Sequence, residues 1–178
     1  IEDIIARTAL DMEKQLLVGD KTAGSTINGL ATILKNSGAV ELTNVASKYD
    51  SVMNVYKAIP ANVLEDTVIF VGKDMFRDLV LELGSKNLYW YDPKITPELE
   101  FTLPNTTTRV VALSGLTGTN VILALQSWNT FYGVDYENGD ATAKMWYSED
   151  DDNFKLRMAW QSGINVAFPA NCVVSKNA

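Results

Sequence analysis

Apolar residues recur at helical spacing at the start of the chain. They fall every three or four positions, and the charged residues lie largely on the other side of the helical wheel. We therefore predict a helix from residue 1 to about residue 18 that buries one face and stops at Gly19. The buried face would consist of Ile1, Ile4, Ile5, Ala9, Met12 and Leu16. Because the pattern already runs at residue 1, which is not Met, we expect a piece of a longer protein.

Helical spacing predicts two more helices before residue 60. The first is short, begins near Ile27 and ends near Gly38. The second is expected to be capped by Asn44, or to start later at Asp50. It ends at Pro60, because proline cannot continue a helix.

Strand patterns dominate the rest of the chain. The apolar run 67–71 predicts a buried strand, and the segment from Gly72 to Gly84 predicts a helix directly after it. Residues 85–108 hold three of the five prolines, so we expect a loop there with little regular structure. Further strands are predicted at 109–114, 121–126, 141–148, 153–160 and 172–175.

Two of these strands, 141–148 and 153–160, flank a polar turn and predict a long antiparallel hairpin. In the second strand, alternation places Phe154, Leu156, Met158 and Trp160 on one face. Since helices come first and strands follow, the patterns favour an α+β fold with a mixed or antiparallel sheet over a doubly wound parallel sheet.

Composition narrows the possible functions. The 178 residues carry a formal net charge of −7, which disfavours binding to nucleic acid and to anionic membranes. No apolar run reaches the ~18 residues of a membrane span. Histidine is absent, which removes the commonest general base and metal ligand. The single cysteine, Cys172, lies in an apolar run and is expected to serve packing. We therefore expect no enzyme, no cofactor and no metal site.

The segment Gly19 to Thr26, "GDKTAGST", is one residue away from a phosphate-binding loop, G-x-x-x-x-G-K-[ST]. Gly19, Gly24 and Thr26 match, but Ser25 stands where the lysine would reach the phosphates. A phosphate loop also follows a strand, whereas a helix is predicted before this one. The segment is therefore expected to be a Gly-rich connection between two helices.

Acidic residues form a second candidate site. Glu149 to Asn153 places four carboxylates together, a composition that suits calcium. Consecutive side chains cannot all face one ion, so a solvated hairpin turn is favoured, with weak calcium binding or charge pairing between subunits as the alternatives. The segment from Asp135 resembles a calcium loop, but its glycine is one place early and the closing acid is missing.

Aromatic residues form a third candidate. Trp128, Tyr132, Trp146 and Trp160 have side chains that can stack on a ligand. Aromatic side chains within amphipathic or alternating runs more often belong to the core, which is the interpretation we favour here.

The order of these segments resembles the C-terminal two thirds of a tailed-phage major capsid protein of the HK97-like fold. Residues 13–34 are similar to the part of that family in which a long helix runs into a Gly-Asp loop and then a short helix. The strand followed by a helix is similar to residues 68–87, and the closing hairpin and terminal strand to residues 139–174. The N-terminal arm and the extended hairpin arm of that family have no counterpart in the chain.

The resemblance implies a structural subunit of a bacteriophage or prophage icosahedral capsid. Such a subunit self-associates into pentamers and hexamers that enclose DNA, without sequence-specific contacts to nucleic acid and without a membrane. It implies an axial lobe at 39–135 and a peripheral lobe formed by 1–38 and 136–178. It also implies location in the virion after assembly in the bacterial host cytoplasm, and no catalytic, cofactor-binding or metal residues.

Two alternatives stay open at this point. An encapsulin-type nanocompartment shell protein resembles the same fold but encloses an enzyme instead of DNA. A non-enzymatic module that binds calcium or another ligand would use the acidic turn and the aromatic residues.

Overall fold

The computed structural model describes residues 2–86, 99–104, 106–134, 142–150, 152–159 and 161–176. Its helices are α1 (Glu2–Val18), α2 (Leu30–Asn36), α3 (Lys48–Ala58) and α4 (Lys73–Ser85). Its strands are β1 (Val40–Thr43), β2 (Thr67–Gly72), β3 (Glu100–Thr102), β4 (Arg109–Leu113), β5 (Ile122–Gln126), β6 (Thr130–Val134), β7 (Thr142–Ser148), β8 (Asn153–Ala159), β9 (Ser162–Val166) and β10 (Val173–Lys176). Helices and strands together form the α+β architecture that the sequence predicts.

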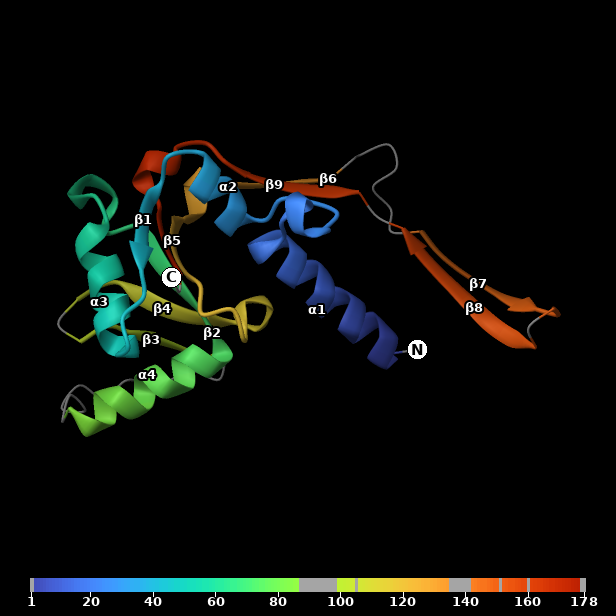
Figure 1. Ribbon diagram of the computed structural model, residues 1–178, viewed down its shortest axis with the longest axis horizontal. Coiled ribbons are helices and arrows are strands. Elements are labelled where there is room, and N and C mark those ends of the chain that lie inside the picture. Colours follow the sequence, from blue (N-terminus) through green and yellow to red (C-terminus); the bar gives the residue numbers. More distant parts are fainter. Residues whose placement is uncertain are drawn as a thin grey trace.

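Six of the strands form one mixed sheet in the order β1-β10-β5-β2-β4-β3 (Figure 1). Strand β2 lies inside the sheet, antiparallel to β5 and parallel to β4. Strand β10 pairs in parallel with β1 and antiparallel with β5. The strands predicted at 109–114 and 121–126 are therefore not neighbours, because β2 separates them.

The sheet buries both of its faces. In β5, Ile122 and Ala124 belong to a core shared with α3 and α4, whereas Leu123 and Leu125 belong to a second core with α2 and the end of α1. Successive residues of a strand point to opposite faces, so a strand covered on both sides needs a continuous apolar run. This requirement explains the uninterrupted apolar sequence of β5.

Two ribbons extend from this body (Figure 1). Strands β6 and β9 pair antiparallel, and strands β7 and β8 form the predicted long hairpin with Tyr147 opposite Phe154. The hairpin projects away from the sheet and lies farther out than β6 and β9. Within the described residues, no helix has both the length and the apolar character needed to cross a membrane.

Helix α1 differs from the sequence expectation. Its predicted apolar face is largely exposed, and Ile4 and Ile5 are 48% and 52% accessible. Only the second half of the helix meets the body: Leu17 is buried, and Glu13 Oε1 accepts a hydrogen bond from Gly115 N at 3.0 Å. The periodicity identified the helix correctly, but it could not tell whether this chain or another molecule covers the apolar side.

Helix α3 is capped by neither Asn44 nor Asp50. Ser47 is its N-cap, and the Ser47 side chain accepts a hydrogen bond from Asp50 N. The Asn44 side chain instead donates to Asn120 O and accepts from Ser175 Oγ at 2.6 Å. Asn44 thus holds β10 beside the loop before β5.

Strands β1, β3, β6 and β9 are not in the sequence prediction. Strand β3 lies inside the segment expected to be a loop; residues 87–98 of that segment lie outside the described residues. Strands also alternate with helices more than the predicted segregation implied, since β1 and β2 each precede a helix. Strands β1 and β3, at the two edges of the sheet, have four and three residues, too few for a clear alternating pattern.

Candidate assembly surfaces and a lysine-lined cavity

The hairpin β7·β8 exposes an apolar face. Met145 and Tyr147 lie on the same side of β7, and Phe154 lies opposite Tyr147 with the two ring centroids 5.3 Å apart. Phe154 is 72% accessible, although a Phe in a folded chain is usually well covered. An isolated two-stranded ribbon is at best marginally stable in water. A projecting ribbon with an exposed apolar face is therefore suited to packing against another molecule.

The opposite face of this hairpin is basic and aromatic. It carries Lys144 and Trp146 on β7, which face Arg157 and Lys155 on β8. All four side chains are exposed. The two faces therefore differ in chemistry, so they suit different neighbours.

The acidic turn joins the two strands of the hairpin. Glu149, Asp150 and Asp152 are exposed, and Asp151 lies outside the described residues. The Tyr147 hydroxyl donates a hydrogen bond to the Asp152 carboxylate, which raises the pKa of Tyr147. No group of three or more acidic, Cys or His residues in the described part of the chain is placed to hold a metal ion. The three described carboxylates of the turn are thus open to solvent.

The second ribbon also exposes apolar side chains. Phe131, Tyr132 and Val134 of β6 are exposed, and nearby the exposed rings of Trp128 and Phe168 lie 6.2 Å apart. The expectation that Trp128, Tyr132 and Trp146 belong to the core is therefore wrong; Trp160 lies outside the described residues. Alternation along a strand looks the same whether its cover comes from the same chain or from a partner.

The segment Gly19 to Thr26 joins helices α1 and α2, as predicted. Asp20 Oδ1 accepts hydrogen bonds from Thr22 N at 2.8 Å and Thr22 Oγ1 at 2.6 Å, and these bonds lower the pKa of Asp20. The Ser25 N–H donates to Asp20 O at 2.9 Å, and Gly24 adopts a left-handed φ of 95°. The backbone N–H groups of Thr22 and Ser25 are thus used to fold the loop. The segment resembling a calcium loop from Asp135 lies outside the described residues.

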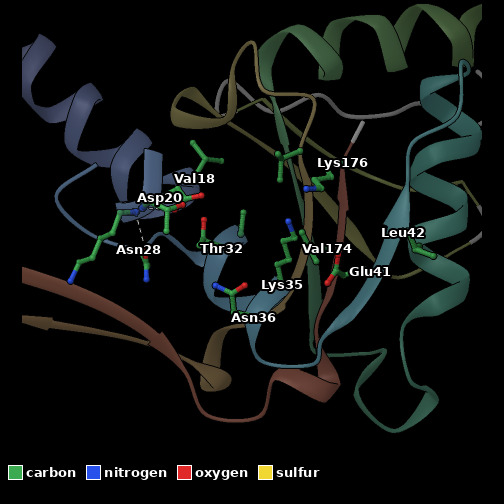
Figure 2. Close-up of a pocket in the computed structure, with 14 residues that line it drawn as sticks. Val18, Asp20, Asn28, Thr32, Lys35, Asn36, Glu41, Leu42, Val174 and Lys176 are labelled. Carbon is green, nitrogen blue, oxygen red and sulfur yellow. Dashed lines mark hydrogen bonds between the residues drawn. The ribbon is translucent and has the colours of Figure 1, made fainter. Parts of the chain in front are cut away.

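A cavity of about 430 Å³ opens beside this loop (Figure 2). Its lining includes Asp20 from the loop, Lys35 from α2, Glu41 from β1 and Lys176 from β10. Figure 2 shows Lys35 and Lys176 extending from different elements into the same space. Sequence reasoning missed this site, because its residues come from four separate segments and no local motif joins them.

Cys172 is fully buried, and burial raises its pKa to about 11, although Asn129 partly opposes this by donating a hydrogen bond to Sγ at 3.3 Å. Beside it, Gln126 Nε2 donates to Thr67 Oγ1 at 2.8 Å, and Asn129 Nδ2 donates to Phe168 O at 3.0 Å. The thiolate form that reacts is therefore scarce at neutral pH. Cys172 serves packing, as predicted.

No family model and no characterised protein sequence matches the chain. Solved structures do match. A chain from Mycobacterium phage Che8 gives a TM-score of 0.61 at 16% identity, covering 96% of this chain and 60% of that chain. A chain from the satellite phage P4 procapsid, solved with the size determination (Sid) protein, gives a TM-score of 0.63 at 13% identity. The match covers 98% of this chain and 61% of that chain. A chain from a structure described as the capsid of an empty GTA particle gives a TM-score of 0.57 at 10% identity. The match covers 99% of this chain and 63% of that chain.

At these identities the likeness shows the fold. The chain shares the α+β fold of these solved chains, which include a chain of a phage procapsid and a chain of a GTA capsid, in agreement with the resemblance detected in the sequence. It spans 60%, 61% and 63% of the length of the three solved chains.

Proposed function

We propose that the protein is a structural subunit of a bacteriophage or prophage capsid, which self-associates into pentamers and hexamers that enclose DNA. The observation that carries this proposal is the exposed apolar surface on two ribbons that extend from a well-packed body. The fold shared with capsid structures supplies the context in which such surfaces meet copies of the same chain.

Within this proposal the subunit has two lobes. The axial lobe, 39–135, contains most of the six-stranded sheet with α3 and α4, and would meet its neighbours around the five-fold and six-fold axes. The peripheral lobe, 1–38 with 136–178, contributes α1 and the hairpin β7·β8. Strand β10 joins the two, since it belongs to the second range and pairs with β1 and β5 of the first.

The proposed role needs no catalysis. Histidine is absent from the sequence, and the only thiol is buried with a raised pKa. A net charge of −7 suits a shell that encloses DNA without sequence-specific contacts. We place the protein in the virion, after assembly in the bacterial host cytoplasm.

The apolar face of the hairpin supplies a direct test. The double variant Met145→Ser/Phe154→Ser removes exposed apolar area that self-association would bury, and each buried side chain of this size contributes about 1.5–3 kcal/mol. We expect its association to weaken by roughly tenfold or more. The comparison variant, Lys144→Ser/Arg157→Ser, changes two residues on the opposite face of the same hairpin, and a smaller loss of association than in the apolar-face variant would assign the main contact to the apolar face.

Sedimentation velocity and electron microscopy of the wild-type chain and both variants give the readout. Closed shells or rings of five or six wild-type copies that are lost in the apolar-face variant would support the proposal. A wild-type chain that stays monomeric at every concentration would contradict it.

A further inference from the structure

The cavity beside the Gly19 to Thr26 loop holds two lysines that approach each other. Lys35 projects from α2 and Lys176 from β10, and both line the same space (Figure 2). Both side chains are exposed, and the nearby Lys35 amino group, together with its charge repulsion, lowers the pKa of Lys176. Two ammonium groups held together in this way are stabilised when an anion lies between them.

The carboxylates in the cavity do not fully balance these lysines. The charge of Lys35 attracts Asp20, but the hydrogen bonds from the backbone and hydroxyl of Thr22 act on that carboxylate more strongly. Glu41 attracts Lys176 more weakly than Lys35 repels it. Among the described residues, neither Lys35 nor Lys176 lies within 4.0 Å of a carboxylate oxygen. The cavity therefore keeps room, and positive charge, for an additional acidic group.

The cavity is large enough for more than a single ion. Its volume of about 430 Å³ lies within the range of about 300–1,000 Å³ common for ligand pockets. Asn36 and Thr32 add polar side chains to the lining. This volume suits the side chains of a tight turn that carries more than one carboxylate.

The chain itself carries such a turn, at the tip of the projecting hairpin. Glu149 and Asp150 are exposed, and within the described residues neither forms an ion pair. In Figure 1 the hairpin points away from the body that contains α2, β1 and β10. The tip therefore faces outward, into solvent.

We propose that the acidic turn of one copy docks into the lysine-lined cavity of a second copy, with its carboxylates against Lys35 and Lys176. This inference rests on the proposed function, because it names one contact of the self-association. A contact between two different surfaces of identical chains is head-to-tail and closes into a ring when the rotation permits. Tip and cavity are two such surfaces, so their pairing fits rings of five or six copies.

Charge reversal tests the pairing. The variant Lys35→Glu/Lys176→Glu reverses the charge of the two cavity lysines, and the variant Glu149→Lys/Asp150→Lys reverses the charge of the hairpin tip. Each variant alone places like charges together, so we expect its association to weaken by about tenfold or more. In an equimolar mixture the reversed tip of one variant meets the reversed cavity of the other, and the two variants can alternate around a ring of six copies. We therefore expect pairwise association and rings of six to recover close to the wild type, whereas rings of five cannot alternate and stay weakened.

The control is Lys57→Glu/Lys73→Glu, which changes the net charge by the same amount at two exposed lysines outside the cavity. Its association is expected to match that of the wild type. Thermal denaturation of every variant checks folding. If the cavity variant fails to fold, the tip variant still tests the contact, since its substitutions lie in an exposed turn.

The outcomes separate this inference from the proposed function. A cavity variant that assembles as tightly as the wild type, or a mixture that fails to recover association, overturns the docking and leaves the capsid role standing. A wild-type chain that never associates overturns both. Inorganic phosphate supplies a further outcome. If it stabilises the wild type but not the cavity variant, and association is the same in both, the cavity binds a small anion and the docking is overturned.

Discussion

Glu82 of α4 secures the start of the neighbouring helix α3. Its carboxylate accepts hydrogen bonds from Ser47 Oγ at 2.8 Å, Lys48 N at 2.9 Å and Tyr49 N at 2.9 Å. The first N–H groups of a helix have no partner inside the helix, so an acceptor from outside satisfies them. Burial raises the pKa of Glu82, but the bonds from Tyr49, Lys48 and Ser47 outweigh burial and hold the pKa below 4.5.

We expect Glu82→Gln to lower the free energy of unfolding by about 1–2 kcal/mol at pH 7, because an amide nitrogen replaces one accepting oxygen. A carboxyl whose pKa is lowered by folding stabilises the protein above its unfolded pKa, near 4.5, and loses this contribution as the pH falls through its folded pKa. The gap between wild type and variant should therefore close in acid. Urea denaturation across this pH range measures it.

The exposed Asp78 supplies a control on the same helix. Asp78→Asn removes the same charge, and its stability is expected to stay within about 0.5 kcal/mol of the wild type. A stability gap for Glu82→Gln that does not change with pH would contradict the charged cap.

The partnership of Glu82 and Ser47 is of a kind that sequence patterns do not predict. The two residues are 35 positions apart and lie on different helices. Ser47 carries a usable local signal, since Asp50 follows it at the spacing of a capping box. The Lys35 and Lys176 pair has no such signal, because the packing of α2 against β10 brings these residues together.

At the scale of elements, the connection between α1 and α2 depends on two glycines in close contact. Gly29 N donates to Gly19 O at 2.8 Å. A Cβ atom on Gly19 would lie 2.4 Å from Gln15 O and 2.7 Å from Ile27 O, both backbone atoms that cannot move aside cheaply. The close backbone contact at Gly19 and Gly29 fixes the position of α1 relative to α2, and with it the wall of the adjoining cavity.

Gly19→Ala should therefore lower the stability by about 1–3 kcal/mol. Gly84→Ala is the opposite case: Gly84 lies within α4 and an added Cβ would meet nothing within 4 Å. Its replacement is expected to stabilise the protein by about 0.4–1 kcal/mol, by restricting the unfolded chain. Thermal denaturation of both variants compares them, and equal shifts in the same direction would refute the steric account.

Elements with strong periodicity were predictable, and weakly patterned ones were not. Helices α1 and α4, strand β2 and the hairpin β7·β8 follow the sequence expectation closely. Strands β6 and β9 were not predicted. Gly133 and Gly163 lie opposite each other in this ribbon, and glycine weakens a strand pattern. The exposure of the ribbons could not be predicted from the sequence either. An alternating apolar pattern is the same whether the same chain or another molecule covers the apolar side chains.

At the scale of the whole molecule, β10 connects the two cores of the sheet. Val173 is buried in the core with α3 and α4, and Val174 in the core with α2. The same strand pairs with β1 on one side and β5 on the other. Its loss would expose both neighbours and leave β1 without a partner among the described strands.

A chain that stops at Cys172 is expected to lose cooperative unfolding. Burying each valine contributes about 1.5–3 kcal/mol, and a whole domain is stable by only about 5–15 kcal/mol. Circular dichroism during thermal denaturation measures the loss. A synthetic peptide of residues 172–178 should restore a transition by adding the missing strand. A truncated chain with a normal transition would show that β10 is dispensable.

The position of β10 also ties folding to protein synthesis. Val40 pairs with Val173, so 133 positions (173 minus 40) separate the partners. While a ribosome makes the intervening residues, β1 presents an unpaired edge, and open edges recruit strands from other chains. The segment that carries the two ribbons with exposed apolar side chains therefore emerges from the ribosome before β1 gains its partner strand. We therefore expect that a chaperone that shields β1 until residue 176 is released would raise the yield of folded protein.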